Sequence, residues 1–197
     1  MASVPKLFTT AEAAVLAETP PAAVEKAVEE GIIEIRKAQL TKVSSRKRRL
    51  LPSESVYYVA FLRKCELHFS KEHKRRLWTW FKKTQPDHLL TATCELSPGV
   101  HIKPGELIDA VYKRVNWYSR ARDRWIEANP DIKGGTPVIR GTRMSVYSVA
   151  GRLNHGESID QILEDNPDIP PEAIEAAQTF ADANPLVGRP GGRPWRE

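Results

Sequence analysis

"NPDIKGGTPVIRGTRMSVYSVAGRLNHGESIDQILEDNPDIPPEAIEAAQTFADAN", residues 129–184, is the stretch that decides how the last third of the chain folds. Its first part predicts a short strand, because the apolar residues Val138 and Ile139 stand between two turn signals. Gly134 and Gly135 come before this strand, and Gly141 after it permits a tight reversal. The stretch therefore opens with a small β-hairpin.

Three short helices are expected after this hairpin, and each has its own start signal. The signals are Ser145 as the cap of residues 146–154, Ser158 and Gln161 as a capping box, and Pro170 and Pro171 at the start of the third helix. Gly156 stops the first helix. In the third, Ile174, Ala177 and Ala181 recur at helical spacing. A trihelical unit with a β lead-in is a compact interaction module, without an obvious catalytic constellation.

The sequence motifs of this stretch resemble a known family. The run "GGTPVIRGTRMSV", followed by "LNHGESIDQILEDNPDIPPEAIEAAQTFA", closely resembles the small bacterial domain called domain of unknown function 433, over roughly residues 126–183. Members of that family look like antitoxins of VapBC-like systems, which pair with small PIN-like ribonucleases. The resemblance therefore implies a VapB-like role, with a toxin as protein partner and often an operator DNA. Spacing alone predicts only a small helical binding domain.

Length and composition set loose bounds on the class of protein. The chain has 197 residues and a formal net charge of +5, which suits one or two small domains that lean basic. Such a charge permits nucleic acid as a partner but does not require it. The first residues lack the apolar core of a signal peptide, and no apolar run approaches the roughly 20 residues of a membrane helix. A soluble, cytoplasmic protein is expected.

The N-terminal residues predict a helix-turn-helix. Thr9 and Glu12 have capping-box spacing at the start of an alanine-rich run. Thr19 is expected to cap a second helix that has Pro20 at its first position and stops at Gly31. Two short helices joined by about two residues are the skeleton of a helix-turn-helix.

A basic hairpin is expected after these two helices. "IIEIRK" and "RRLLP" are strand-like, and helix, helix and hairpin in this order describe a winged helix that resembles the MerR type. Between Arg36 and Arg49 the chain has seven cations and no acidic residue. Such a loop suits phosphate contacts, because each neutralised phosphate releases condensed counterions. The alternative is a solvated loop without a partner.

The candidate DNA-binding residues come from the second helix and the hairpin. Glutamates on the exposed face of that helix repel phosphate, so base readout is expected only from its first turn and from Lys26. This modest readout favours a homodimer that binds two half-sites. The candidates are Thr19, Ala22, Lys26, Arg36, Lys37, Arg46, Lys47, Arg48 and Arg49.

The middle of the chain is expected to link the two ends. Ser53 and Ser70 each precede a predicted helix as its cap. The first of these helices is expected to direct its apolar residues, including Leu67, into the core of the winged helix. A β-hairpin around Pro98 and Gly99 comes next. The segment closes with a long amphipathic helix, which is expected to carry the dimer seam and has on one face Leu107, Val111, Val115 and Tyr118.

No enzymatic activity, metal or cofactor is expected. The one group of soft metal ligands has no structural zinc spacing: Cys65, His68, His73 and Cys94. The acids that could suggest a nuclease site lie at helix ends without a second acidic cluster: Glu164, Asp165 and Asp168. Gly134 and Gly135 lack the downstream lysine of a phosphate-binding loop.

The tail "NPLVGRPGGRPWRE", residues 184–197, is expected to be flexible because it has three prolines and three glycines. PIN-like nucleases hold divalent metal with acidic side chains, so an inserted arginine, with Arg193 favoured, could pair with those carboxylates. Trp and Arg also dominate many interfaces. The alternative is a terminus of no consequence. The candidate toxin-binding residues are Leu186, Val187, Arg189, Arg193, Trp195 and Arg196.

These patterns predict a mainly α fold with small β-hairpins. The expected domains are a winged helix-turn-helix (1–69), a helical linker and dimerisation segment with a β-hairpin (70–125), a trihelical antitoxin domain (126–183) and a flexible toxin-binding tail (184–197). The expected function is that of a type II antitoxin. It would inhibit a cognate PIN-like ribonuclease toxin within a hetero-oligomer and repress its own operon. A stand-alone dimeric transcription regulator is the alternative, and an adaptor without DNA binding is a third interpretation.

Overall fold

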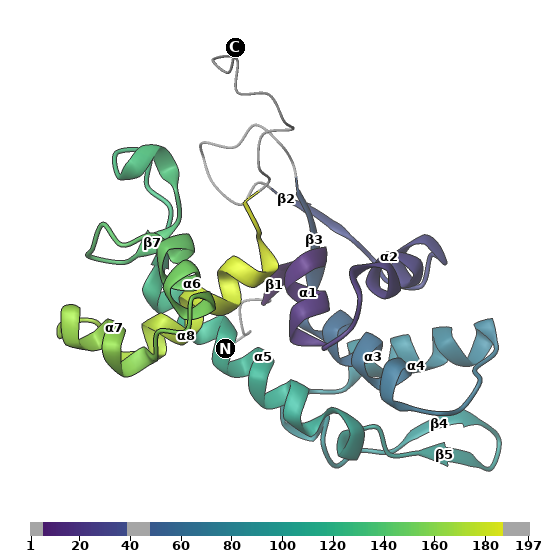
Figure 1. Ribbon diagram of the computed structural model, residues 1–197. Helices are drawn as coiled ribbons and strands as arrows, with labels where there is room; N and C mark the ends of the chain where they lie inside the picture. The colour runs from purple at the N-terminus through teal and green to yellow at the C-terminus, as the bar shows by residue number, and fades with distance from the viewer. Residues whose placement is uncertain (1–5, 39–47, 187–197) are drawn as a thin grey trace. The chain divides into compact units, whose positions relative to one another are not determined.

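The computed structural model describes residues 6–38 and 48–186, and its described part is mainly helical with small antiparallel sheets, as predicted (Figure 1). The chain divides into two compact units, residues 1–123 and 124–197. The predicted boundary near residue 125 lies within two residues of this division. The predicted boundary after residue 69 has no counterpart, because the segments on both sides of it belong to the first unit.

The N-terminal unit begins with a helix-turn-helix, and the hairpin that follows it forms a three-stranded sheet with the first strand of the chain. Its elements are β1 (Leu7–Thr9), α1 (Thr10–Leu16), α2 (Pro21–Glu29), β2 (Arg36–Ala38), β3 (Arg48–Pro52) and α3 (Ser53–Lys64). The strand order is β1-β3-β2, with both pairs antiparallel. The pairing of β2 with β3 confirms the predicted hairpin, while β1 was not predicted. The expected strand over residues 32–35 is absent from the structure, and Ile32 and Ile33 are buried in the core instead.

A helix, a hairpin and a long helix complete this unit. They are α4 (Lys71–Lys83), a 3-10 turn η1 (Pro86–His88), β4 (Cys94–Ser97), β5 (Val100–Ile102) and α5 (Gly105–Trp125), whose last two residues belong to the second unit. Strands β4 and β5 form the predicted hairpin. Helix α4 is fastened to it, because Arg76 donates to the Leu96 carbonyl at 3.0 Å and the Trp80 indole to the Thr93 carbonyl at 3.1 Å.

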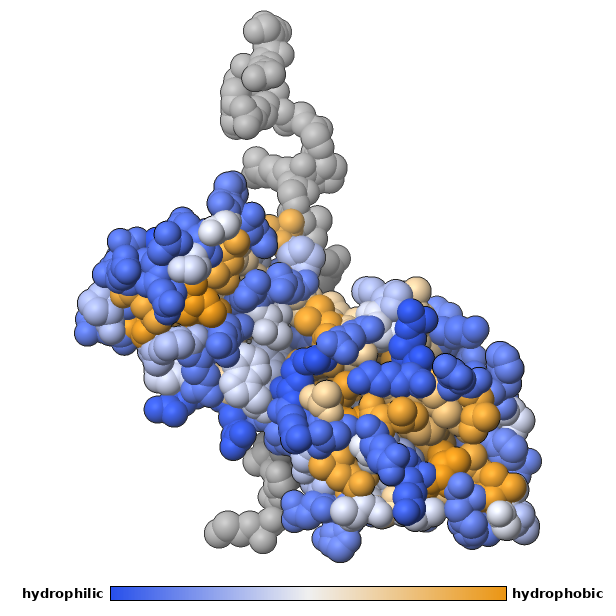
Figure 2. All heavy atoms as spheres, turned by 60° about the horizontal axis from the view of Figure 1, so that its bottom comes forward, coloured by the Kyte–Doolittle hydropathy of each residue, from blue (hydrophilic) through white to orange (hydrophobic). Residues whose placement is uncertain are grey.

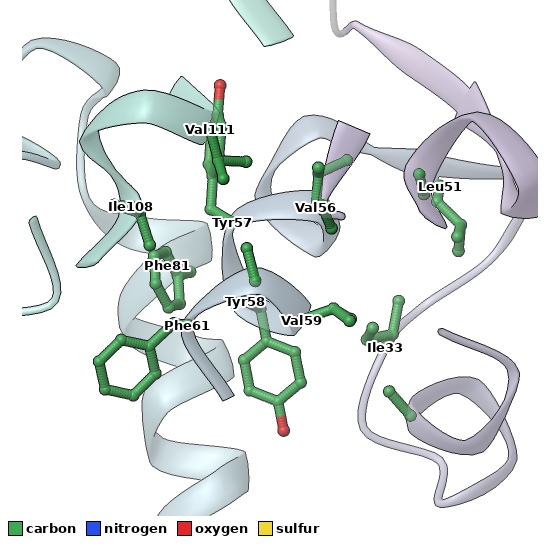
Figure 3. Close-up of a cluster of buried hydrophobic side chains, with 14 of the residues drawn as sticks. Ile33, Leu51, Val56, Tyr57, Tyr58, Val59, Phe61, Phe81, Ile108 and Val111 are labelled. Carbon is green, nitrogen blue, oxygen red and sulfur yellow. The ribbon is translucent and has the colours of Figure 1, made fainter. Parts of the chain in front are cut away.

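One hydrophobic core runs through the whole N-terminal unit. Figure 3 shows Tyr58 and Phe61 of α3 close to Phe81 of α4. Ile108 and Val111 of α5 belong to the same cluster. Val111, Val115 and Tyr118 are fully buried in this core. The apolar face of α5 therefore packs within its own unit, so these residues are not free for a contact with a second copy, and a dimer seam elsewhere on this helix stays a prediction.

Three predictions about the starts of α2 and α3 and about the core were wrong. Thr19 does not cap α2, and Ser53 does not cap α3, because a proline is the N-cap of both helices: Pro20 for α2 and Pro52 for α3. A residue before proline avoids the helical region, so Pro20, which precedes Pro21, stays extended and the helix begins one residue later. Leu67 is 60% exposed, because α3 ends at Lys64 before it can bring that residue into the core.

The C-terminal unit has the predicted hairpin and three helices. Its elements are β6 (Ile126–Glu127), η2 (Lys133–Gly135), β7 (Val138–Ile139), α6 (Val146–Asn154), α7 (Ile159–Asp165) and α8 (Pro171–Ala183). Strand β7 pairs with β6, and Gly141 has a positive φ of 77° at the predicted reversal. Ser145 caps α6, and Ser158 and Gln161 form the predicted capping box of α7.

Helix α8 forms the centre of the second core. Ala173, Ile174 and Ala177 are fully buried there, together with Val146 and Val149 of α6. The small side chains of α8 permit the close packing of these two helices, and alanine also favours the helical conformation. The indole of Trp125 donates to the Glu172 carboxylate at 2.9 Å, which joins the end of α5 to the first turn of α8.

Candidate functional site

The predicted DNA-binding elements lie next to one another in the N-terminal unit. Helices α1 and α2 are in contact, and the β2–β3 hairpin follows them (Figure 1). In this hairpin Arg36 lies opposite Leu50, Lys37 opposite Arg49 and Ala38 opposite Arg48. The structure thus combines a helix-turn-helix with a hairpin that has cationic residues in both strands.

The predicted DNA-binding residues have different places in this arrangement. Ala22 and Lys26 are exposed on α2, and Arg49 is exposed on β3. Arg36, Lys37 and Arg48 are strand residues, and Arg46 and Lys47 lie outside the described residues. Thr19 is only 8% exposed, in the turn before α2, so it is not available for the base contact expected of it.

The acids of α2 are only partly compensated by neighbouring cations. Glu25 and Glu29 are exposed. The carboxylate of Glu30 is bound by Lys74 of α4 at 3.0 Å, and Glu34 is bound by Lys82 at 2.5 Å. These two ion pairs connect α4 to the end of α2 and to the segment after it, so α4 supports the helix-turn-helix. Sequence spacing gave no indication of these contacts, because they join residues 44 and 48 positions apart.

A cavity of about 320 Å³ lies beside α2. Its walls come from α2, the C-terminal half of α3, the α3–α4 connection and Lys74 of α4. Thr19 is part of the wall, and its buried hydroxyl has no hydrogen-bond partner among the described residues.

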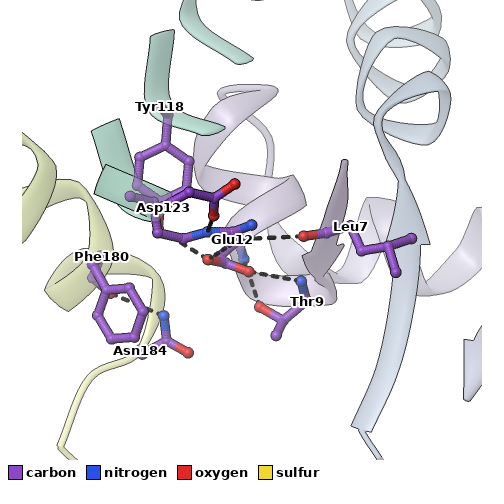
Figure 4. Close-up of polar contacts among 8 residues, drawn as sticks. Leu7, Thr9, Glu12, Tyr118, Asp123, Phe180 and Asn184 are labelled. Carbon is purple, nitrogen blue, oxygen red and sulfur yellow. Dashed lines mark hydrogen bonds and ion pairs between the residues drawn. The ribbon is translucent and has the colours of Figure 1, made fainter. Parts of the chain in front are cut away.

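A buried polar network fixes α5 against α1 and β1, and the sequence gave no sign of it. The Glu12 carboxylate is 3% exposed and accepts hydrogen bonds from the Tyr118 hydroxyl at 2.9 Å and from Arg122 at 3.0 Å. Its other oxygen accepts from the Thr9 backbone amide at 2.8 Å (Figure 4). Arg122 also donates to the Leu7 carbonyl at 3.2 Å.

Electrostatics within this network favour the neutral tyrosine beside the ion pair. Burial raises the pKa of Tyr118, and the Glu12 carboxylate raises it further. Arg122 lies over the Phe8 ring at 5.2 Å and over the Tyr118 ring at 5.7 Å, so aromatic faces surround its guanidinium. The network satisfies its members internally and faces the core, which identifies it as a structural tie between helices.

The predicted toxin-binding residues fall almost entirely outside the described part of the chain. Leu186 is 68% exposed. Val187, Arg189, Arg193, Trp195 and Arg196 lie outside the described residues.

The charges of the C-terminal unit are arranged unevenly. Residues 153–186 contain eight Asp and Glu and no Lys or Arg. Arg152 at the end of α6 binds two of these acids, Glu157 at 2.6 Å and Asp165 at 2.5 Å. This ion-pair cluster joins α6 to α7. Asp165, one of the acids considered for a nuclease site, is therefore engaged in a salt bridge.

The cysteines and histidines considered for metal binding do not converge. Within residues 6–38 and 48–186 no three Cys, His, Asp or Glu side chains are grouped so that they could hold a metal ion. Cys94 is buried in β4, and its burial raises the pKa of the thiol to about 11. Cys65 is half-buried, and both cysteines are free thiols. In the same part of the chain no helix is long and apolar enough to cross a membrane.

The C-terminal unit matches a known family. Residues 126–181 match the family described as "Protein of unknown function (DUF433)". The curated "Uncharacterized protein y4eO" of Sinorhizobium fredii (strain NBRC 101917 / NGR234) is 48% identical over 64 residues. These residues are 32% of this chain and 29% of that protein, so the chain spans less than a third of that relative.

A likeness to a solved structure extends over more of the chain but is weak. The X-ray crystal structure of Rv2018 from Mycobacterium tuberculosis is similar with a TM-score of 0.41 and 16% identity, over 89% of this chain and 98% of that chain. A likeness at this level supports no conclusion about function.

The family match of residues 126–181, by contrast, agrees with the sequence motifs. The hairpin and three helices of this stretch constitute a domain of the DUF433 family, as those motifs predicted.

Proposed function

We propose that this chain is the antitoxin of a type II toxin–antitoxin system. In this proposal the N-terminal unit represses the operon by binding its operator DNA. The C-terminal domain and the following tail bind and inhibit a PIN-like ribonuclease. The observation that supports the proposal best is the helix-turn-helix followed directly by the cationic β2–β3 hairpin.

Charge supports the assignment of DNA to the N-terminal unit. Residues 1–123 contain 22 Lys and Arg against 14 Asp and Glu. In the hairpin, Lys37 occupies the position opposite Arg49. Like charges at opposed positions of a ladder repel each other, and bound phosphates would relieve that repulsion. Because the acids of α2 remain exposed, the hairpin is the main contact to the DNA backbone and α2 contributes little beyond Lys26.

The assignment of a toxin to the C-terminal unit rests on the family resemblance and on charge. A ribonuclease needs a cationic surface to hold RNA. Residues 153–186 contain eight carboxylates and no Lys or Arg, and two of the eight, Glu157 and Asp165, are paired with Arg152. The tail adds three arginines and Trp195, residue types that form strong interface contacts. The acidic helices would then cover the RNA-binding surface of the toxin while the tail enters its acidic metal site.

The hairpin is tested by replacing Arg46, Lys47, Arg48 and Arg49 with alanine. Binding to the promoter fragment is measured over a range of salt concentrations. The plot of log affinity against log salt should become less steep, with its negative slope reduced in magnitude by about one for each phosphate contact removed. A charge-matched control replaces four exposed cations of the same unit, Lys64, Lys71, Arg75 and Lys83. Equal effects of the two variants would show that the hairpin is not part of the DNA interface.

The tail is tested by deleting residues 184–197. Because the deletion leaves α1, α2 and the β2–β3 hairpin intact, DNA binding should be unchanged. Inhibition of the ribonuclease should be lost if a tail arginine occupies the metal site. In a finer test, Arg193→Ala is compared with Arg189→Ala, and the larger loss is expected at Arg193. Full inhibition by the truncated protein would contradict the role of the tail.

A stand-alone transcription regulator is the second candidate function, and one observation favours it. The cavity beside α2 lies against the helix-turn-helix, where a bound ligand would act directly on DNA binding. The gene neighbourhood separates the two functions. A small gene for a ribonuclease of one domain beside this gene supports the antitoxin, and its absence supports the regulator.

A further inference from the structure

The cavity beside α2 combines an apolar interior with free cations. About half of its lining is apolar, with side chains from Ala23, Ala27, Val59, Leu62 and Phe69, and the polar half includes Lys26, Glu30, Arg63, His68 and Lys74. Leu67, exposed at 60%, is also part of its wall. In the larger body of Figure 2, apolar side chains likewise reach the surface between charged ones. A cavity of this kind can hold an apolar body and a charged head at the same time.

The charges around the cavity are not balanced. Lys26 and Arg63 both line it and are exposed, and the side chain of neither has an ion pair or hydrogen bond within the described part of the chain. The one carboxylate in the wall, Glu30, is already bound by Lys74 at 3.0 Å. Two cations are therefore available to an anion, while the acid of the wall is neutralised.

We propose that this cavity binds a small amphipathic carboxylate, with its hydrocarbon part in the interior and its carboxylate between Lys26 and Arg63. The volume of about 320 Å³ is at the lower end of the roughly 300–1,000 Å³ that small-molecule sites have, so the ligand is small. No DNA and no toxin is needed for this binding.

Occupancy of the cavity has a consequence that rests on the proposed DNA binding. The wall includes the turn residue Thr19 together with Ala23 and Lys26 of α2. A carboxylate that pairs with Lys26 removes this cation from the DNA backbone, so the ligand weakens operator binding. Coupling of this kind is reciprocal, and DNA must weaken ligand binding by the same factor.

The site is tested with octanoate as the probe and the full chain as the protein. Titration is followed by calorimetry and by NMR chemical shifts, in the absence of DNA. Octanoate should bind saturably at one site. Octanamide, which lacks the charge, and acetate, which lacks the hydrocarbon, should bind at least about tenfold more weakly, equivalent to about 1.4 kcal/mol. Equal binding of octanoate and octanamide, or no binding of octanoate, would overturn the proposal.

Two neighbouring alanines provide a matched pair of variants. Ala23→Phe fills the cavity and should abolish octanoate binding, whereas Ala22→Phe adds the same group at an exposed position outside the cavity and should leave it unchanged. If Ala23→Phe does not fold, Arg63→Glu tests the charged rim. It should weaken octanoate at least fivefold and leave octanamide unchanged. Unchanged octanoate binding in the folded Ala23→Phe or in Arg63→Glu would contradict the site.

The regulatory consequence has its own measurement. Promoter binding is compared with and without saturating octanoate in the wild type, in Ala23→Phe and in Thr79→Phe, which adds the same group at an exposed α4 position outside both the cavity and the candidate DNA-binding residues. Octanoate should weaken DNA binding in the wild type and in Thr79→Phe, but not in Ala23→Phe. Octanoate binding without an effect on DNA would overturn the coupling. A chain that binds octanoate but no DNA would overturn the proposed repressor function and leave the site intact.

Discussion

At the scale of single residues, Glu12 connects the start of α1 to the distant helix α5. It is a capping-box residue of α1, as the sequence predicted, but its carboxylate also binds Tyr118 and Arg122 of α5. A buried carboxylate is stable only when its charge and its hydrogen-bonding capacity are both satisfied. One side chain thus determines a local helix start and a contact between residues more than a hundred positions apart.

Glu12→Gln should destabilise the chain by about 3 kcal/mol, because it removes the buried counter-ion of Arg122 and leaves only Asp123, which is 68% exposed and 3.4 Å away. Glu18→Gln is the matched control. It removes an ion pair with Arg114 in which Glu18 is 56% exposed, and exposed pairs contribute about 1 kcal/mol or less. Urea unfolding followed by tryptophan fluorescence measures both. A loss for Glu12→Gln no larger than that of the control would show that the network does not stabilise the fold.

The two cysteines should differ in reactivity. Cys94 is 1% exposed and its thiol pKa is raised to about 11, so at pH 8 it is both inaccessible and protonated. Cys65 is half-buried. A maleimide reagent should label one thiol in the native protein and two in denaturant, and mass spectrometry of peptides should locate the native label at Cys65. Rapid native labelling of Cys94 would contradict the packing of β4.

At the scale of secondary-structure elements, local signals were successful where the chemistry is local. Ser70, Ser145 and the Ser158–Gln161 pair cap the helices that they were predicted to cap. Thr19 and Ser53 failed because a neighbouring proline takes the N-cap position. The pairing of β1 with β3 and the burial of the α5 face were beyond the sequence, because periodicity shows that a face is apolar but not what covers it.

Ser70→Ala should lower the free energy of unfolding by about 1 kcal/mol, because the Ser70 hydroxyl accepts from the His73 amide at 3.2 Å. Ser53→Ala is the control, since Ser53 is the first residue of α3, after the N-cap Pro52, and does not cap the helix. Its effect should remain within about 0.5 kcal/mol. Chemical denaturation of the two variants distinguishes these values. An equal loss for both would show that α3 begins at Ser53 as a cap.

Two glycines in helices should respond in opposite directions to alanine. A Cβ at Gly105, the first residue of α5, would lie 2.0 Å from the Leu90 carbonyl oxygen, so Gly105→Ala must displace backbone and destabilise the unit. Gly151 in α6 has no atom within 4 Å of that position, and Gly151→Ala should stabilise by about 0.5–1 kcal/mol. Thermal unfolding measures both. A tolerated Gly105→Ala would contradict the close approach of α5 to Leu90.

At the scale of the whole molecule, two units with separate cores have opposite charge. Residues 1–123 have an excess of cations, whereas residues 124–186 have ten carboxylates against five Lys and Arg. This distribution supports the proposal of two different partners, one polyanionic and one cationic. The domain family was predictable from the motifs of residues 126–181. The cavity beside α2 was not, since its walls come from segments between residues 19 and 74 that only the tertiary fold brings together.

The most direct test of the antitoxin proposal is an RNA-cleavage assay on the co-purified product of the neighbouring small gene. This chain and that product are expressed together, purified as a complex and then separated. The proposal predicts a stable complex without ribonuclease activity, and activity that appears when this chain is removed and disappears when it is added back. A neighbouring product that does not co-purify, or that leaves RNA intact when alone, would contradict the antitoxin function.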